Sequence, residues 1–250
     1  MFKKLKFLPI ILFAVIMANC SSSVDTSKFT TEEYYNYAYK LYETEDYERA
    51  LQEFQNFVLQ FSGSAFYDKA QYYLGMSYYK RKQYLLGAYE FSKLIKNIPA
   101  SFFVPDAQYM LADSYFKLSP SYQLDQAYTK KAVEEYQAFI DFFPKDPKVA
   151  DAEKNIKILY EKLAQKDFQS ALIYERMDYS KAAMKYYGSV AEVYHDTKFA
   201  PMALYRKIMI ELNRSLTNDA VSDIGMYLSR YPNDSNAKEI HDLEVKLSSK

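Results

Sequence analysis

The feature that most constrains the fold of this chain is an internal repeat with a period of 37 residues. Phe54 and Phe91 are 37 positions apart (91 − 54 = 37). The small residues Ala38, Gly75 and Ala112 keep the same spacing, and each is followed four positions later by an aromatic residue. Residues four apart lie on one face of a helix. A unit of this length buries its apolar face only by stacking on its neighbours, so the sequence predicts a row of helical units.

This pattern resembles the tetratricopeptide repeat, in which each unit is a pair of antiparallel helices. Small residues at matched positions let the two helices approach closely, and large rings fill the gaps between pairs. We therefore predict an all-α fold, a tetratricopeptide-repeat superhelix of about five helix pairs, over residues 31–250. The predicted repeats are at about 31–62, 67–99, 104–144, 165–195 and 199–232, with an extra helical stretch at 148–164 and a C-terminal helix at about 236–247.

The first twenty residues have the pattern of a bacterial lipoprotein signal. Three lysines precede an apolar run from Phe7 to Met17, which is shorter than the roughly 20 residues that span a bilayer. Cys20, the single cysteine, comes just after this run, following Ala18 and Asn19. We predict a signal peptide at 1–19, acylation of Cys20 and a flexible tether at 20–30. Asn19 departs from the small residue usual before such a cysteine, and the alternative is ordinary secretion with an incidental cysteine.

Composition argues against several classes of function. Without the three lysines of the signal segment, 29 basic residues (32 − 3 = 29) face 32 acidic ones, so the chain lacks the positive charge of a nucleic-acid binder. The two histidines, His195 and His241, are far apart and have no cysteine partner at a metal-site spacing. No glycine-rich phosphate loop is present. We expect no metal, no cofactor and no catalysis.

The first helix of each early repeat carries a row of aromatic residues. In tetratricopeptide repeats this helix faces the concave side, and the positions three before and four after the small residue turn toward it. Other residues of the same helices, such as Leu41, Leu74 and Leu111, already supply a core face. Tyrosine suits a wet binding surface because its ring buries area while its hydroxyl stays hydrogen-bonded. We predict a groove for an extended, aromatic-containing peptide, lined by Tyr35, Tyr39, Tyr42, Tyr72, Met76, Tyr79, Tyr109 and Phe116. The alternative is that these rings are core residues between helices.

Short motifs in the second half of the chain resemble the BamD family, the tetratricopeptide-repeat lipoproteins of the outer-membrane β-barrel assembly machine. These motifs are Asp125-Gln126, Ala132, Phe139, Phe143-Pro144, Leu163-Ala164, Tyr174, Arg176, Tyr179, Ala182-Ala183, Tyr186, Tyr194-His195-Asp196-Thr197 and Ala203-Leu204. The family usually has proline where His195 stands. Ser21, rather than Asp, after the cysteine resembles lipoproteins that are sent to the outer membrane.

The resemblance implies a periplasmic scaffold anchored in the outer membrane by lipid. Its N-terminal repeats would recognise the aromatic-ended C-terminal segment of unfolded β-barrel precursors, and its C-terminal repeats would dock the barrel insertase and other subunits of the machine. Candidate docking residues are Asp196, Thr197, Lys198 and Arg206.

Other readings stay open at this level. A tetratricopeptide lipoprotein that coordinates cell-wall synthesis or division would carry an N-terminal coiled coil, and no heptad segment is seen here. A glycan- or nutrient-binding lipoprotein would carry long loop insertions around a pocket. An enzyme would show convergent polar groups with shifted pKa values in such a pocket.

Overall fold

The computed structural model describes residues 25–248, so the predicted signal peptide at 1–19 and the acylation site Cys20 lie outside the described residues. The described part is all-α and contains no strand, which confirms the predicted fold class. One 3₁₀ turn precedes eleven α-helices: η1 Thr26–Lys28, α2 Thr31–Glu43, α3 Tyr47–Gln60, α4 Tyr67–Lys80, α5 Tyr84–Asn97, α6 Val104–Leu118, α7 Ala127–Phe142, α8 Val149–Arg176, α9 Ser180–Val193, α10 Phe199–Asn213, α11 Thr217–Arg230 and α12 Ala237–Ser248.

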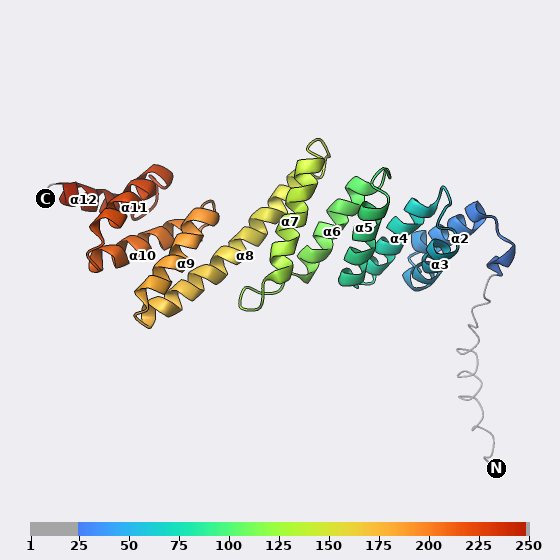
Figure 1. The fold of residues 1–250 in the computed structure, drawn as a ribbon, viewed down its shortest axis with the longest axis horizontal. Coiled ribbons are helices and arrows are strands. Elements are labelled where there is room, and N and C mark those ends of the chain that lie inside the picture. Colours follow the sequence, from blue (N-terminus) through green and yellow to red (C-terminus); the bar gives the residue numbers. More distant parts are fainter. Residues whose placement is uncertain (1–24, 249–250) are drawn as a thin grey trace, which may run out of the picture.

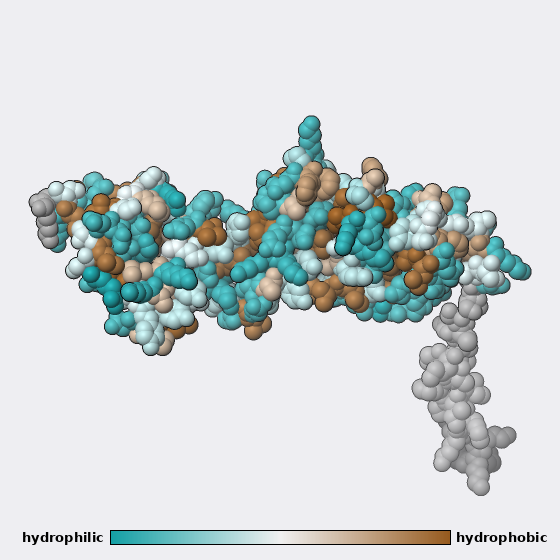
Figure 2. All heavy atoms as spheres, viewed as in Figure 1, coloured by the Kyte–Doolittle hydropathy of each residue, from teal (hydrophilic) through white to brown (hydrophobic). Residues whose placement is uncertain are grey.

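The helices form one elongated row, with α2 at one end and α12 at the other (Figure 1). Each helix packs against its neighbours in the chain, and the first helices of adjacent pairs, α2 and α4, also touch. Polar and apolar side chains are interspersed along the face drawn in Figure 2. Because each helix pair packs mainly on the adjacent pairs, the fold is a solenoid.

In four of the five helix pairs, the turn inside the pair is built around one residue with left-handed backbone conformation. Glu45, Lys82, Asp178 and Ser215 have φ of 61°, 61°, 57° and 57°. In all four turns the next residue donates its N–H to the carbonyl five positions earlier, at 2.9 Å. This is the hydrogen bond of the Schellman motif, which usually places glycine at the left-handed position. Two pairs of these residues are one sequence period apart (82 − 45 = 37; 215 − 178 = 37), and all four turns have the same geometry without the usual glycine.

The turn between pairs is also repeated. Ser64, Ser101, Asp146, Thr197 and Asp234 occupy equivalent places in the five turns. Each donates its N–H to the residue three positions earlier and accepts with its carbonyl from the residue three later, at 3.0 ± 0.1 Å. In four of them the side-chain oxygen accepts the N–H two residues on, as Ser, Thr, Asn and Asp do in such turns.

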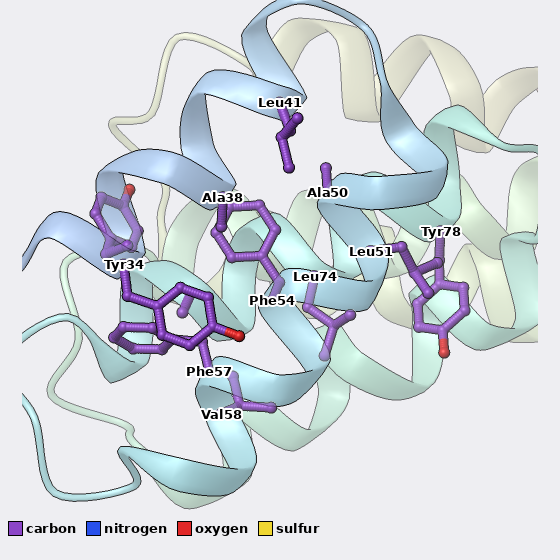
Figure 3. Packing of buried hydrophobic residues seen from close by; sticks show 12 residues of the cluster. Tyr34, Ala38, Leu41, Ala50, Leu51, Phe54, Phe57, Val58, Leu74 and Tyr78 are labelled. Carbon is purple, nitrogen blue, oxygen red and sulfur yellow. The ribbon is translucent and has the colours of Figure 1, made fainter. Parts of the chain in front are cut away.

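Small residues and large rings build the core between these turns. Ala38, Ala50 and Phe54 are fully buried, and Figure 3 shows the ring of Phe54 beside Ala38. Gly75 is the matching small residue of the second repeat, and a methyl group added to it would lie 2.7 Å from the Phe91 ring. The close approach of a glycine to a ring is therefore why the repeat keeps a small residue here.

The helix α8 differs from the prediction. We predicted one helical stretch at 148–164 and a new repeat from 165, whereas a single helix of 28 residues spans both. Its buried residues Ile156, Leu159, Leu163, Phe168 and Ala171 keep a helical period across the predicted break. No proline or glycine interrupts them. The first half packs on α7 and the second on α9, so α8 joins the N-terminal and C-terminal repeats.

The end of the predicted tether is ordered in the structure. Residues Thr26–Lys28 form a 3₁₀ turn capped by Asp25, and the Phe29 ring packs edge-on against Tyr37 at 5.9 Å. Thr30 then starts α2 with a capping box, in which its hydroxyl accepts from Glu33 N–H while the Glu33 carboxylate accepts from Thr30 N–H. The part of the tether from 25 to 30 is thus packed on the first repeat.

Candidate peptide-binding surface

Aromatic rings from α2, α4 and the turn before α6 meet in a continuous group that we call the tyrosine stripe, made of Tyr39, Tyr42, Tyr72, Tyr73 and Phe103. Tyr39 and Tyr42 of α2 lie edge-on to Tyr73 of α4, with ring centroids 4.8 and 5.1 Å apart. Tyr72 stacks on Phe103 at 5.0 Å, and Tyr73 lies 6.3 Å from the same ring. All five side chains are half-buried.

The backbone holds the two ends of the stripe in place. The capping box at Thr30 and Glu33 fixes the start of α2, the helix that carries Tyr39 and Tyr42. At the other end, the Ser101 hydroxyl accepts the N–H of Phe103 at 3.1 Å and orders the turn that carries this ring. The stripe is therefore preorganised by helix starts and turns rather than by a mobile loop.

The hydroxyls of Tyr42, Tyr72 and Tyr73 stay protonated at neutral pH. Burial raises the pKa of Tyr42 to about 12, and burial raises the pKa of Tyr72 and Tyr73 further. A neutral phenol both donates and accepts hydrogen bonds. The stripe thus offers ring faces for apolar side chains and hydroxyls for a peptide backbone.

Tyr35 requires a correction. We predicted it in the groove, but it is only 7% exposed and belongs to the core of the first repeat. Its ring stacks on Phe66 at 5.2 Å and lies 6.2 Å from both Phe54 and Phe57. The turn before α4 supplies Phe66, and this ring covers the side of Tyr35 that a lone helix would expose.

The remaining predicted groove residues are half-buried but do not form one group. Met76 and Tyr79 pack on the core between the second and third repeats. Tyr109 and Phe116 pack around Tyr136 and Phe139 of α7, in the third repeat. The structure therefore brings Tyr39, Tyr42 and Tyr72 together and leaves the last two residues in a separate cluster.

Sequence reasoning missed Tyr73, the ring that connects the stripe. It contacts Tyr39, Tyr42, Phe54, Tyr72 and Phe103. Asn36 and Met110 stand at the equivalent positions of the adjacent repeats, so the repeat alignment gave no signal there. The run Tyr72-Tyr73 was the available sign, because two consecutive rings on a helix cannot both point at the same core.

A polar network links the second and third repeats to α8. Asp113 of α6 accepts hydrogen bonds from the hydroxyls of Tyr79 and Tyr136, the latter at 3.0 Å, and Asn155 of α8 donates to Tyr136 at 2.8 Å. Burial and the Asp113 carboxylate raise the pKa of both tyrosines. The network ties α4, α6, α7 and α8 together and occupies the Tyr79 hydroxyl.

The predicted docking residues lie at the turn before α10 and on α10 itself. The Asp196 side chain is 88% exposed and accepts from His195 at 2.9 Å. Lys198 donates its N–H to Glu161 at 3.1 Å, and Arg206 donates to both oxygens of Glu175 at 3.2 and 3.1 Å. Glu161 and Glu175 both belong to α8, so these two contacts close the turn and α10 onto the joining helix.

Thr197 is the second correction. It is 5% exposed, and its hydroxyl donates to the Tyr194 carbonyl at 2.7 Å. It is one of the five turn residues described above, and Asp234 is its equivalent one period later (234 − 197 = 37). A partner cannot reach this side chain without opening the turn, so its role is to shape the turn.

The described residues contain no group of three or more histidine, cysteine, aspartate or glutamate side chains that could hold a metal ion. Within residues 25–248, no helix is long and apolar enough to cross a membrane.

A family model described as YfiO, outer membrane lipoprotein, matches residues 27–228. No curated protein matches the chain. Similar solved structures include a thermophilic tetratricopeptide-repeat protein of Thermus thermophilus, at 15% identity and a TM-score of 0.37, covering 88% of this chain and 98% of that one. A repeat protein of Bacteroides fragilis has 13% identity and a TM-score of 0.49 with the same coverages. At these identities the solved structures carry no functional argument, whereas the family model spans most of the chain.

Proposed function

The chain belongs to the YfiO family of outer membrane lipoproteins, and from this premise we propose that it is a non-catalytic scaffold of the outer-membrane protein assembly complex. Its N-terminal repeats bind unfolded β-barrel precursors, and its C-terminal repeats dock the barrel insertase. Cys20 carries the lipid that holds the chain on the periplasmic face of the outer membrane. Two or more acyl chains are needed for stable anchoring of this kind.

The observation that carries this proposal is the tyrosine stripe. Tyr39, Tyr42 and Tyr73 present half-buried rings and hydroxyl groups on the first helices of two adjacent repeats. An aromatic side chain at the end of a peptide gains offset or edge-on contacts with such rings, worth about 0.5–1.5 kcal/mol per pair beyond the area they bury. The half-buried state of the rings means that part of each stays available while the rest fixes its orientation.

The start of the described chain, at Asp25, and the stripe lie near the same end of the row (Figure 1). Phe29 packs on Tyr37, so the chain enters the first repeat from a fixed point close to α2. The stretch from Cys20 to Asp25 extends at most about 20 Å. A lipid on Cys20 therefore holds the stripe close to the membrane into which barrel precursors insert.

The C-terminal docking proposal rests on the turn before α10. Asp196 and Lys198 are exposed there, and Arg206 lies on the adjacent helix with its guanidinium on Glu175. Charged groups at a rim set the orientation and rate of association more than its strength. We therefore assign this region to the positioning of the insertase.

A peptide-binding measurement tests the first half of the proposal. A fluorescent peptide with the last residues of an outer-membrane β-barrel protein, ending in phenylalanine, should bind the full-length protein in detergent. The same peptide ending in alanine should bind about tenfold more weakly, which corresponds to about 1.4 kcal/mol. Equal affinity for the two peptides would contradict recognition of an aromatic end.

Co-purification tests the second half. The tagged, full-length protein should recover the barrel insertase from detergent-solubilised outer membranes, and the double variant Asp196→Ala/Lys198→Ala should recover less of it. A matched control is Asp141→Ala, which removes an exposed acid at the end of α7. Recovery of cell-wall enzymes or a nutrient transporter in place of the insertase would replace the assembly role by one of the alternatives.

A further inference from the structure

A pocket of about 350 Å³ lies between α9, α10 and α11, in the last repeats and away from the tyrosine stripe. Its walls carry charged side chains: Lys181 and Lys185 of α9, Lys207 and Glu211 of α10, and Asp219 and Asp223 of α11. Met184 and Leu216 supply apolar surface between them. None of these residues contributes to the surfaces described above.

The buried part of the pocket holds one cation and two anions. Lys207 lies between Glu211 and Asp223, with its ammonium 3.0 Å from one Glu211 oxygen and bonded to an Asp223 oxygen. Glu211 and Asp223 are 2% and 7% exposed. Two buried carboxyl groups therefore share one ammonium group.

The second oxygen of Glu211 has no hydrogen-bond partner among the described residues, although it is shielded from solvent. A buried carboxylate oxygen without a donor is costly, and such groups are rare in folded proteins. Burial, together with the nearby Asp223, raises the pKa of Glu211, which records the same unfavourable environment. Glu211 lines the pocket, so the pocket is the route by which a donor for this oxygen would have to enter.

The backbone adds to the preference for positive charge. Glu211 lies in the last turn of α10, which ends at Asn213. The carbonyl end of a helix carries partial negative charge and favours cations. Asp219, an exposed acid on the pocket wall, offers further acceptor oxygens.

We propose that this pocket receives an arginine side chain of a partner protein, whose guanidinium donates to the free Glu211 oxygen and to Asp219. A guanidinium carries five donors in a planar fork and is less strongly hydrated than an ammonium, so it enters partly buried acidic sites at lower cost. The arginine stem lies along Met184 and Leu216. Lys181 and Lys185 are exposed, so their ammonium groups lie in water at the ends of long stems. There they face an acidic residue of the partner, next to its arginine.

This inference does not depend on peptide binding at the tyrosine stripe, because the pocket and the stripe lie in different repeats. A failure of either experiment therefore leaves the other standing.

The test uses saturation-transfer difference NMR on the full-length protein in detergent, with Nα-acetyl-arginine methylamide as the probe. The neutral isostere Nα-acetyl-citrulline methylamide is the control ligand. We expect signal from the δ-methylene protons of the arginine probe and at least tenfold weaker binding of the citrulline probe, because hydrogen bonds to charged groups are the stronger ones. Equal signal from the two probes, or no signal from either, would overturn the proposal and leave a solvated pocket.

Variants locate the binding. Glu211→Gln should weaken arginine binding about tenfold, and so should Asp219→Asn, which leaves the buried ion pairs untouched. The matched control Glu192→Gln changes an exposed acid of α9 outside the pocket and should leave binding unchanged. Circular dichroism checks that each variant is folded. If arginine binding is unaltered in both pocket variants, the arginine lies elsewhere and the assignment is wrong.

Discussion

Tyr39 of α2 and Tyr73 of α4 meet edge to face with ring centroids 4.8 Å apart and planes at 66°. This contact joins the first helices of two repeats. Met76 and Met110 stand at the equivalent positions one period later, so the ring pair does not recur there. Both side chains are half-buried, so part of each ring stays accessible to solvent. The pair therefore both couples the repeats and presents aromatic surface.

Replacement of Tyr39 by leucine should separate binding from stability. Tyr39→Leu keeps apolar volume but removes the ring contacts with Tyr73 and Tyr42, so affinity for an aromatic-ended peptide should fall about tenfold. The free energy of unfolding should fall by only about 1 kcal/mol, because the side chain is half-buried. Fluorescence anisotropy and urea unfolding measure the two effects. Tyr89→Leu, at a tyrosine of α5 that is 63% exposed and outside the stripe, should change neither.

Tyr35 should behave as a core residue. Tyr35→Ala removes a ring that packs on Phe54, Phe57 and Phe66, and the free energy of unfolding should fall by about 3 kcal/mol or more. Thermal and urea unfolding followed by circular dichroism provide the measurement. A loss below about 1 kcal/mol would mean that the side chain is exposed in solution, as we first predicted from the sequence.

Two glycine-to-alanine changes should have opposite signs. Gly75→Ala places a methyl group 2.7 Å from the Phe91 ring, and the ring is fully buried and cannot move freely. Overpacking of this kind costs about 1–3 kcal/mol. Gly225→Ala adds a methyl group within α11 that meets nothing within 4 Å, and the higher helix propensity of alanine should stabilise the chain by about 0.5–1 kcal/mol. Differential scanning calorimetry of the two variants compares them directly.

The left-handed turn residues should tolerate glycine well. Lys82 has φ of 61°, a conformation that costs a non-glycine residue about 1–2 kcal/mol. Lys82→Gly removes this cost and adds about 0.5–1 kcal/mol of backbone entropy in the unfolded state, so the net effect should be a small gain in stability. Lys154→Gly is the matched control, an exposed lysine inside α8, and should lose about 1 kcal/mol. Equal destabilisation by the two changes would contradict the turn geometry.

Stability should fall on the alkaline side of pH 10. Burial raises the pKa of Tyr42 to about 12, above the ordinary value of 10. The native state therefore keeps a proton that the unfolded chain loses, and stability that is fully present below pH 10 declines as the pH rises toward 12. Tyr34 and Tyr194, whose pKa values burial also raises to about 12, act in the same direction.

Urea unfolding at pH 8, 10 and 11, with tyrosinate absorbance followed in parallel, checks this dependence. Tyr42→Phe cannot ionise, and no described residue is hydrogen-bonded to the Tyr42 hydroxyl. The variant should match the parent at pH 8 and lose less stability at pH 11. An unchanged pH dependence in Tyr42→Phe would show that this tyrosine does not contribute.

The sequence by itself determined the all-α repeat architecture and its period. Small residues recur at matched positions, such as Ala38 and Gly75, and each has an aromatic residue four positions later. This pattern can be recognised in the sequence because each repeat contacts only its neighbours, so similar contacts require similar residues in every repeat. The same period indicated where turns fall, and Ser64, Ser101 and Asp234 are turn residues of the usual kind.

Only the tertiary structure decided which rings are core and which form a surface. Tyr35 is buried because Phe66, from the turn before the next repeat, covers it, and no periodicity within α2 could indicate this. Tyr73 connects the stripe because its ring contacts rings from α2, from α4 and from the turn before α6. The orphan oxygen of Glu211 likewise depends on where α10 meets α11. A helical pattern shows which face of a helix is apolar, but the exposure of a side chain depends on what the rest of the chain places against it.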